Sequence, residues 1–178
     1  MSNEIDQAVQ RAFEAQEERH LTDAKSEWSA AVELSRQEAN SLALARALRS
    51  QGEIERKLHD PEAARLHYEE AAALYRGLSD PLALAHTIRH LGDVYRESHL
   101  PELAQCCYRE ALEIYGAQPE AAPLEVANAI RCMAVLKSEL GERDEARKLW
   151  EQAREIYTTA GVPDGVAESS ARLARLAA

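Results

Sequence analysis

A pattern of small and aromatic residues returns four times along the chain. Each copy has an alanine, a Trp or Tyr four residues later, and a second alanine three residues after that. The copies are Ala24, Trp28, Ala31; Ala64, Tyr68, Ala71; Ala104, Tyr108, Ala111; and Ala146, Trp150, Ala153, at steps of 40, 40 and 42 residues. Steps of four and three residues place these side chains on one face of a helix. Because each copy can bury that face only against its neighbours, the pattern predicts an array of stacked helical units.

A second set of small and aliphatic residues lies upstream of the last three copies. Its members are Ala45, Leu48, Gly52; Ala85, Ile88, Gly92; and Ala127, Ile130, Ala134. Their spacing is also helical. A glycine inside a helix costs about 1 kcal/mol relative to alanine, so its return at Gly52 and Gly92 indicates that two helices approach closely there. Each unit is therefore predicted to be a pair of helices.

Helix boundaries are marked by two Asp-Pro pairs. Asp60-Pro61 and Asp80-Pro81 each combine an N-cap residue with a proline in the first helical position. We predict helices near residues 3–18, 21–36, 40–58, 61–77, 81–98, 101–116, 122–139, 143–160 and 164–177. Short loops between them favour antiparallel neighbours. The helices form units at about 3–38, 40–78, 81–117 and 122–160, with a last helix at 164–177, in one domain of residues 1–178.

The third unit resembles the tetratricopeptide repeat (TPR) family. It has Ile88, Leu91-Gly92 and Tyr95, followed by the Ala, Tyr, Ala set at 104, 108 and 111. The fourth unit keeps most of this pattern, whereas the first helix of the chain offers only Ile5, Ala8 and Ala12, which suits a terminal repeat. HEAT and armadillo repeats have similar lengths but lack the Ala-aromatic-Ala column. The long period is similar to that of kinesin light chains and bacterial regulators.

The resemblance implies an all-α, right-handed superhelical solenoid of four TPR-like helical hairpins plus a C-terminal capping helix. The last segment matches the first helix of a unit, with Ala167, Ser170, Leu173 and Ala174 in register with residues 85, 88, 91 and 92. This helix is predicted either to cap the fourth hairpin or to pair with a second chain. Both a monomer and a homodimer therefore stay open.

In this family the first helix of each hairpin lines an inner groove that holds a partner. Carried onto this chain, the resemblance implies a groove with arginines at equivalent places in successive hairpins. The candidate groove residues are Arg46, Arg49, Arg56, His86, Arg89, Arg96, Asn128 and Arg131. Arginine forks suit carboxylates and phosphates, so a protein or peptide partner with an acidic or phosphorylated segment would fit.

A plain solvated face accounts for the same arginines equally well. Arg49 lies four residues before Glu53 and Arg89 four before Asp93, so each can be neutralised along its own helix. The family's two-carboxylate clamp requires Lys and Asn at inward places. Here those places hold mainly Glu53, Asp93, Phe13 and Val135, so that activity is not predicted.

Composition and charge limit the kinds of partner. The formal net charge is −10 and the pI is near 5.1, which disfavours nucleic acid. No apolar run approaches the roughly 18 residues of a membrane helix, so no membrane partner is expected. The three cysteines Cys106, Cys107 and Cys132 have no C-x-x-C spacing and suit a reducing compartment. The first residues do not resemble a signal peptide, so we expect a cytoplasmic location.

No pattern in the sequence indicates catalysis, a cofactor or a metal. His86 and His90 lie one turn apart but lack the Glu of a zinc protease motif. The glycines are scattered, and no nucleophile elbow is present. The aromatic column of the four repeats is predicted to be core rather than a base-stacking surface. We therefore expect a non-enzymatic protein-interaction scaffold; the alternatives are a homo-oligomerisation module acting through the last helix and a trans-acting regulatory subunit of a bacterial signalling system.

Overall fold

A computed structural model describes residues 3–177 of the chain, and in this range all regular secondary structure is α-helical. Every predicted helix is present, and each predicted end lies within one residue of the observed end. The helices are α1 (Asn3–Glu17), α2 (Leu21–Gln37), α3 (Ser41–Lys57), α4 (Pro61–Gly77), α5 (Pro81–Glu97), α6 (Pro101–Gly116), α7 (Pro123–Glu139), α8 (Arg143–Thr159) and α9 (Pro163–Ala177).

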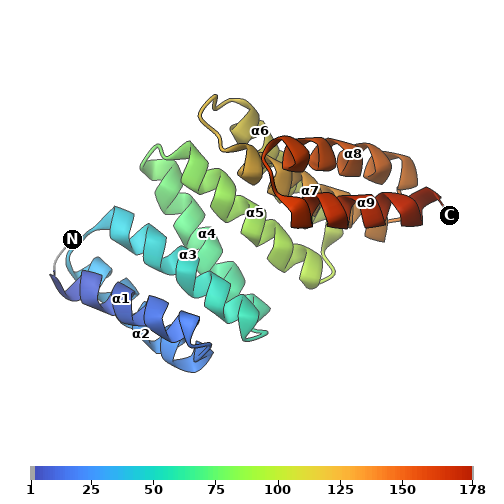
Figure 1. Cartoon of the computed structure of the whole chain (residues 1–178). Coiled ribbons are helices and arrows are strands. Elements are labelled where there is room, and N and C mark those ends of the chain that lie inside the picture. Colours follow the sequence, from blue (N-terminus) through green and yellow to red (C-terminus); the bar gives the residue numbers. More distant parts are fainter. Residues whose placement is uncertain (1–2, 178) are drawn as a thin grey trace.

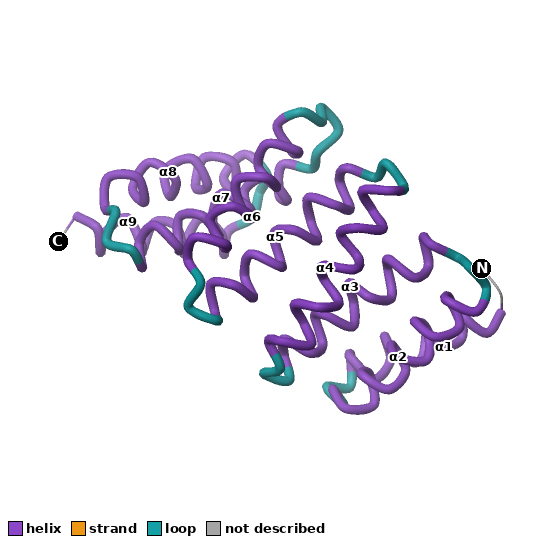
Figure 2. The backbone as a smooth tube through the Cα atoms, turned by 180° about the vertical axis from the view of Figure 1, so that it is seen from behind, coloured by secondary structure: helices purple, strands orange, loops and turns teal. Residues whose placement is uncertain are grey.

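The helices stack in chain order, so that α1 and α9 lie at opposite ends of the array (Figures 1 and 2). Each helix packs on the next one in the sequence, as expected for a TPR-like solenoid. We call α1, α3, α5, α7 and α9 the A helices and α2, α4, α6 and α8 the B helices. Neighbouring A helices also touch directly, α3 with α5 and α5 with α7. None of the helices within residues 3–177 has the length and apolar character needed to cross a bilayer.

The turns between helices repeat one local design. The side chains of Asn40, Asp60 and Asp80 each accept a hydrogen bond of 3.1 Å from the backbone N–H three residues later, which caps α3, α4 and α5. One residue of most turns adopts a positive φ, including His59 at 60°, His99 at 59° and Gly141 at 76°. That conformation ends the preceding helix and suits glycine best.

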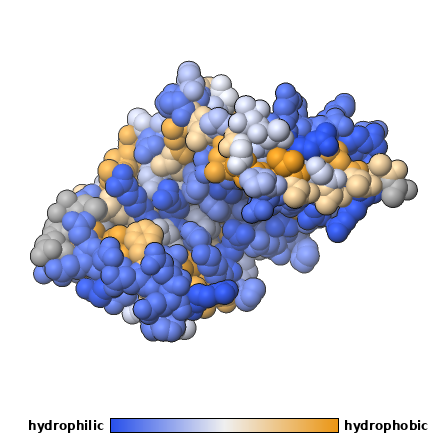
Figure 3. Space-filling view, viewed as in Figure 1, coloured by the Kyte–Doolittle hydropathy of each residue, from blue (hydrophilic) through white to orange (hydrophobic). Residues whose placement is uncertain are grey.

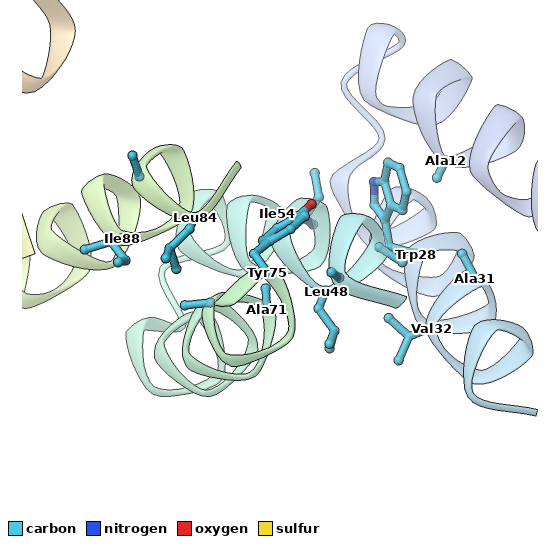
Figure 4. Close-up of a cluster of buried hydrophobic side chains, with 14 of the residues drawn as sticks. Ala12, Trp28, Ala31, Val32, Leu48, Ile54, Ala71, Tyr75, Leu84 and Ile88 are labelled. Atoms are coloured by element: carbon cyan, nitrogen blue, oxygen red, sulfur yellow. The ribbon is translucent and has the colours of Figure 1, made fainter. Parts of the chain in front are cut away.

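The aromatic column is buried, as predicted, and fills the space between the two helices of each hairpin. Trp28, Tyr68, Tyr108 and Trp150 are all at most 2% exposed. Figure 4 shows the core continuing between hairpins, with Tyr75 between Leu84 of α5 and Leu48 of α3.

Glycine allows the close approach that its recurrence predicts. A Cβ on Gly92 would lie 2.6 Å from a ring carbon of Tyr108, and one on Gly52 would lie 3.2 Å from the ring of Tyr68. The A helix therefore rests directly on the aromatic ring of its own B helix.

The last helix, α9, packs on α8 through Gly165, which lies against the ring of Tyr157, and through the buried Ser169. Its opposite face is open, because no helix within the described range follows it. Consequently the residues in register with the buried positions of α5 differ from them in burial. Ala167, Ser170 and Ala174 are exposed, and Leu173 is half-buried.

Candidate functional site on the A-helix face

The predicted groove residues all lie on three neighbouring A helices. Helix α3 carries Arg46, Arg49 and Arg56; α5 carries His86, Arg89 and Arg96; and α7 carries Asn128 and Arg131. Because α3, α5 and α7 pack side by side, the structure brings these residues to one side of the array, which we call the A-helix face. Their environments differ, and the difference decides which of them can meet a partner.

Arg89 is inside the protein rather than on the surface, with only 6% of the residue exposed. Its Nη2 lies 3.0 Å from the Nε2 of His90, and its two Nη atoms lie 3.9 Å from Asp93 and 3.8 Å from Glu125. The buried Nε has no hydrogen-bond partner within residues 3–177. Arg89 therefore serves as the positive centre of an internal network and is shielded from a partner.

Asp93 balances this charge from the same helix. Its carboxylate accepts a hydrogen bond of 2.8 Å from the Tyr108 hydroxyl and lies 3.5 Å from the Nη1 of Arg56. Burial opposes its ionisation, but the adjacent His90, the charge of Arg56 and the Tyr108 hydroxyl outweigh burial and hold its pKa well below the usual range. Burial lowers the pKa of His90, so this imidazole is neutral at pH 7.

Glu125, in the first turn of α7, is a member of the network that the sequence analysis did not identify. One of its oxygens lies 2.9 Å from the Nδ1 of His86 and 3.4 Å from the hydroxyl of Tyr115. The hydrogen bond with His86 outweighs burial and, together with the charge of Arg89, lowers the pKa of Glu125 to about 2. An acidic residue in the first turn is common in any helix, so nothing in its sequence position marks it.

Three more arginines of the predicted groove are neutralised between helices. Each lies against a carboxylate of the next A helix, and the pairs are Arg56–Glu97 at 3.0 Å, Arg96–Glu139 at 2.8 Å and Arg131–Glu168 at 3.6 Å. Asn128 is also engaged, since its Oδ1 accepts a hydrogen bond of 2.8 Å from the Tyr157 hydroxyl. The basic surface expected along three hairpins is thus largely compensated from within.

Arg46 and Arg49 are the exceptions. Arg46 is exposed, Arg49 is half-buried, and neither forms an ion pair with any described residue. The expected pairing of Arg49 with Glu53 along α3 does not form, because Glu53 binds Lys57 at 2.7 Å instead. The two arginines are therefore the uncompensated positive charges of the predicted set.

These two arginines border a recess between α1 and α3. It has a volume of about 210 Å³ and is lined by Ile5, Val9, Phe13, Trp28, Ala43, Arg46, Arg49 and Ser50. A second hollow of about 450 Å³ lies between α3 and α5 and includes Glu53, Arg56, His90 and Glu97. The A-helix face thus holds an apolar recess next to a polar one.

The two histidines of α5 lie within this polar network. The rings of His86 and His90 meet edge to face with centroids 4.7 Å apart, and the His90 ring stacks on Tyr68 at 5.9 Å. Within residues 3–177, no group of three or more His, Cys, Asp or Glu side chains has an arrangement that could hold a metal ion. The histidines therefore take part in hydrogen bonding and packing.

Comparison with known proteins shows the fold. No family model and no curated protein matches the chain. Among solved structures, it is similar to aspartyl phosphate phosphatase F from Bacillus subtilis, with a TM-score of 0.85 and 15% identity; the match covers 96% of this chain and 45% of that protein. It also resembles a putative kinesin light chain with nearly identical TPR-like repeats from Podospora anserina, with a TM-score of 0.79 and 15% identity, covering 97% and 84%.

A third similar structure is BtubC (BKLC) from P. vanneervenii, with a TM-score of 0.61, 15% identity and coverage of 97% and 89%. The chain spans less than half the length of the phosphatase and most of the length of the other two. Together with the stacked hairpins, these likenesses define the fold: the chain folds as a TPR-like helical solenoid.

Proposed function

We propose that this protein is an interaction scaffold that binds a peptide segment of a partner protein along the A-helix face. The observation that carries the proposal is the pair Arg46 and Arg49, uncompensated on a face whose other predicted arginines have partners. In a chain of net charge −10, two such cations favour a partner with an acidic segment. The TPR-like fold supports a role in protein binding rather than catalysis, and the free cysteines support a cytoplasmic setting.

The test is affinity capture from native lysate with the wild-type chain and an Arg46→Glu/Arg49→Glu variant. We expect the variant to lose partners that the wild type retains, because reversal replaces attraction of a carboxylate with repulsion. The matched control is Arg109→Glu/Arg154→Glu, which makes the same change in net charge at exposed sites on the B helices α6 and α8. Equal capture by the wild type and by the α3 variant would exclude the A-helix face as the binding surface.

Homo-oligomerisation through α9 is a second candidate, favoured by the open face of that helix. Ala167, Ser170 and Ala174 are exposed there at positions that are buried in α5. Small residues allow a second helix to approach closely. Sedimentation of the full chain and of a chain that ends at Gly161 distinguishes the candidates, since a dimer that depends on α9 becomes a monomer on truncation, whereas a full chain that is monomeric at all concentrations excludes this role.

A further inference from the structure

The recess between α1 and α3 is apolar because the first hairpin departs from the others at two places. One repeat step of 40 residues relates Val9 to Arg49 and Phe13 to Glu53, so α1 has apolar side chains where α3 is charged. Phe13 is 50% exposed and lines the recess, so its ring contributes apolar surface there. Figure 3 shows apolar surface beside α1 and α3 on the face seen in Figure 1.

The walls of this recess are held in place by packing and hydrogen bonds. The Phe13 ring meets the Trp28 ring edge to face, with centroids 5.1 Å apart and an interplanar angle of 84°. The Trp28 Nε1 donates a hydrogen bond of 2.8 Å to the Gln16 side chain. A pre-formed recess lowers the ordering cost that a bound side chain would otherwise impose.

The volume of the recess limits what can enter it. About 210 Å³ is below the roughly 300–1,000 Å³ of pockets that take drug-sized ligands. It suits one large aliphatic or aromatic side chain. The neighbouring hollow between α3 and α5 allows the rest of an extended segment to continue along the same face.

The charges at the rim of the recess favour a particular kind of residue beside the bound apolar side chain. Arg46 and Arg49 line the recess and have no carboxylate partner within the described range. Two unpaired guanidinium groups at one rim match a carboxylate, which accepts charge-assisted hydrogen bonds from both. Charge complementarity therefore selects an acidic residue next to the apolar one.

A buried hydroxyl of the second hairpin lacks an acceptor. Tyr75 is 1% exposed and its hydroxyl has no hydrogen-bond partner within residues 3–177. Burial raises its pKa, and the charges of Arg49 and Arg46 act in the opposite direction. In the next two hairpins the equivalent hydroxyls have acceptors on α7, namely Glu125 for Tyr115 at 3.4 Å and Asn128 for Tyr157 at 2.8 Å. Because the Tyr75 side chain is buried, this difference lies inside the second hairpin and adds no contact to a bound segment.

We infer that this recess is the anchor site for an extended segment of a partner protein in which a large apolar residue is adjacent to Asp or Glu. The apolar side chain enters between α1 and α3, and the carboxylate binds Arg46 and Arg49. The inference rests on the proposed function and adds to it, because it names the site, the order of contacts and the chemistry of the segment.

Trp28 offers a direct readout, since it lines the recess and the chain has only one other tryptophan, Trp150, in the fourth hairpin. A Trp150→Phe variant would be titrated with the blocked peptides acetyl-Gly-Ser-Phe-Asp-Ser-Gly-amide and acetyl-Gly-Ser-Asp-Phe-Ser-Gly-amide. We expect a saturable change in Trp28 fluorescence with at least one of them. Replacing Phe by Ala or Asp by Asn in that peptide should each weaken binding about tenfold or more.

Variants of the protein separate the two halves of the site. Phe13→Ala shortens a half-exposed side chain in the wall of the recess, and Arg46→Ala/Arg49→Ala removes the charges at its rim. Each variant should weaken peptide binding about tenfold. Each should also keep the helical circular dichroism signal of the unmodified protein. The control variant Arg109→Ala/Arg154→Ala should bind the peptide as tightly as the Trp150→Phe protein does. The carboxylate that binds Arg46 and Arg49 could also be the carboxyl terminus of a partner, and a peptide that ends in Phe with a free carboxyl group and has no Asp tests this. Tighter binding of that peptide than of both blocked peptides would overturn the assignment to an internal segment.

The anchor and the proposed function fail in different ways. If none of the peptides gives a saturable Trp28 signal with the folded protein, or if the Asn peptide binds as well as the Asp peptide, the anchor assignment is wrong. Loss of lysate partners in the Arg46→Glu/Arg49→Glu variant would still uphold binding on the A-helix face in that case.

Discussion

At the scale of single residues, the role of a side chain in this protein depends on the space around it and on the charges beside it. Gly92 is present because the Tyr108 ring occupies the space that a Cβ would need. Arg46 and Arg89 have the same side chain on neighbouring A helices, yet Arg46 faces solvent and Arg89 is enclosed by His90, Asp93 and Glu125. Both distinctions lead to measurable consequences.

Gly92→Ala should destabilise the protein. Overpacking against the Tyr108 ring costs about 1–3 kcal/mol, and the better helix propensity of alanine returns at most about 1 kcal/mol. Urea denaturation followed by circular dichroism measures the difference in the free energy of unfolding. Gly77→Ala is the control, because nothing lies within 4 Å of its added Cβ, and it should be neutral or stabilising. Equal stability of the two variants would contradict the close approach of α5 and α6.

Removing the buried guanidinium should cost far more than removing an exposed one. Arg89→Met leaves Asp93 and Glu125 without their shared cation, and losing one partner of a buried ion pair costs about 3–5 kcal/mol. Arg46→Met, on the same face, should change the free energy of unfolding by no more than about 0.5 kcal/mol. Thermal and urea unfolding of both variants provide the comparison, and similar losses would contradict the internal network.

The network also predicts how stability depends on pH. Folding lowers the pKa of His90 from 6.5, so below that pH the unfolded chain takes up a proton that the folded protein resists, and stability falls as pH decreases. The half-buried His67, whose pKa burial also lowers, contributes with the same sign. Glu125 has a folded pKa of about 2 against 4.5, so its contribution is complete above pH 4.5 and is lost as pH falls towards 2.

Urea midpoints measured between pH 8 and pH 3 test these signs. His90→Gln should flatten the profile between about pH 6.5 and 4.5, because the titrating group is absent. Glu125→Gln should flatten it below about pH 4.5 while leaving the upper part unchanged. A wild-type protein that gains stability on acidification from pH 7 to 5 would contradict the assignment of a neutral, buried His90.

At the scale of helices, the ends are determined by local hydrogen bonds. Asp80 caps α5, and Pro81 occupies the first position, where no backbone N–H is required. Asp80→Ala should therefore cost about 1 kcal/mol in unfolding free energy, whereas Asp80→Asn, which keeps an accepting oxygen, should stay close to the wild type. Urea unfolding of both variants measures the difference, and the capping role is excluded if alanine and asparagine are equivalent there.

At the scale of the whole molecule, each hairpin is stabilised mainly by its neighbours. A chain that ends at Gly161 exposes the ring of Tyr157, which α9 covers through Gly165. We expect faster amide exchange in α7 and α8 and little change in α3 and α4, because stability in a repeat array is a sum of local and nearest-neighbour contributions. Hydrogen exchange with mass spectrometry resolves the two regions. An equal loss of protection throughout would show that the array unfolds as one unit.

The architecture could be predicted from the repeat residues of the sequence. The Ala-aromatic-Ala column, the Asp-Pro boundaries and the recurring glycine predicted every helix to within one residue of its ends. This was possible because helical period, capping and close packing of small residues act between positions only a few residues apart. The choice of the eight candidate groove residues came from the resemblance to the TPR family, and they lie on the neighbouring helices α3, α5 and α7.

Tertiary structure alone decided which arginines are available to a partner. The pairs Arg56–Glu97 and Arg96–Glu139 join residues about forty positions apart, and no spacing rule connects them. Their formation depends on how far one A helix slides along the next, which is an outcome of packing. The recess that brings Phe13 together with Arg49 has the same origin, because burial and charge pairing between helices are properties of the stacked hairpins and not of any one of them.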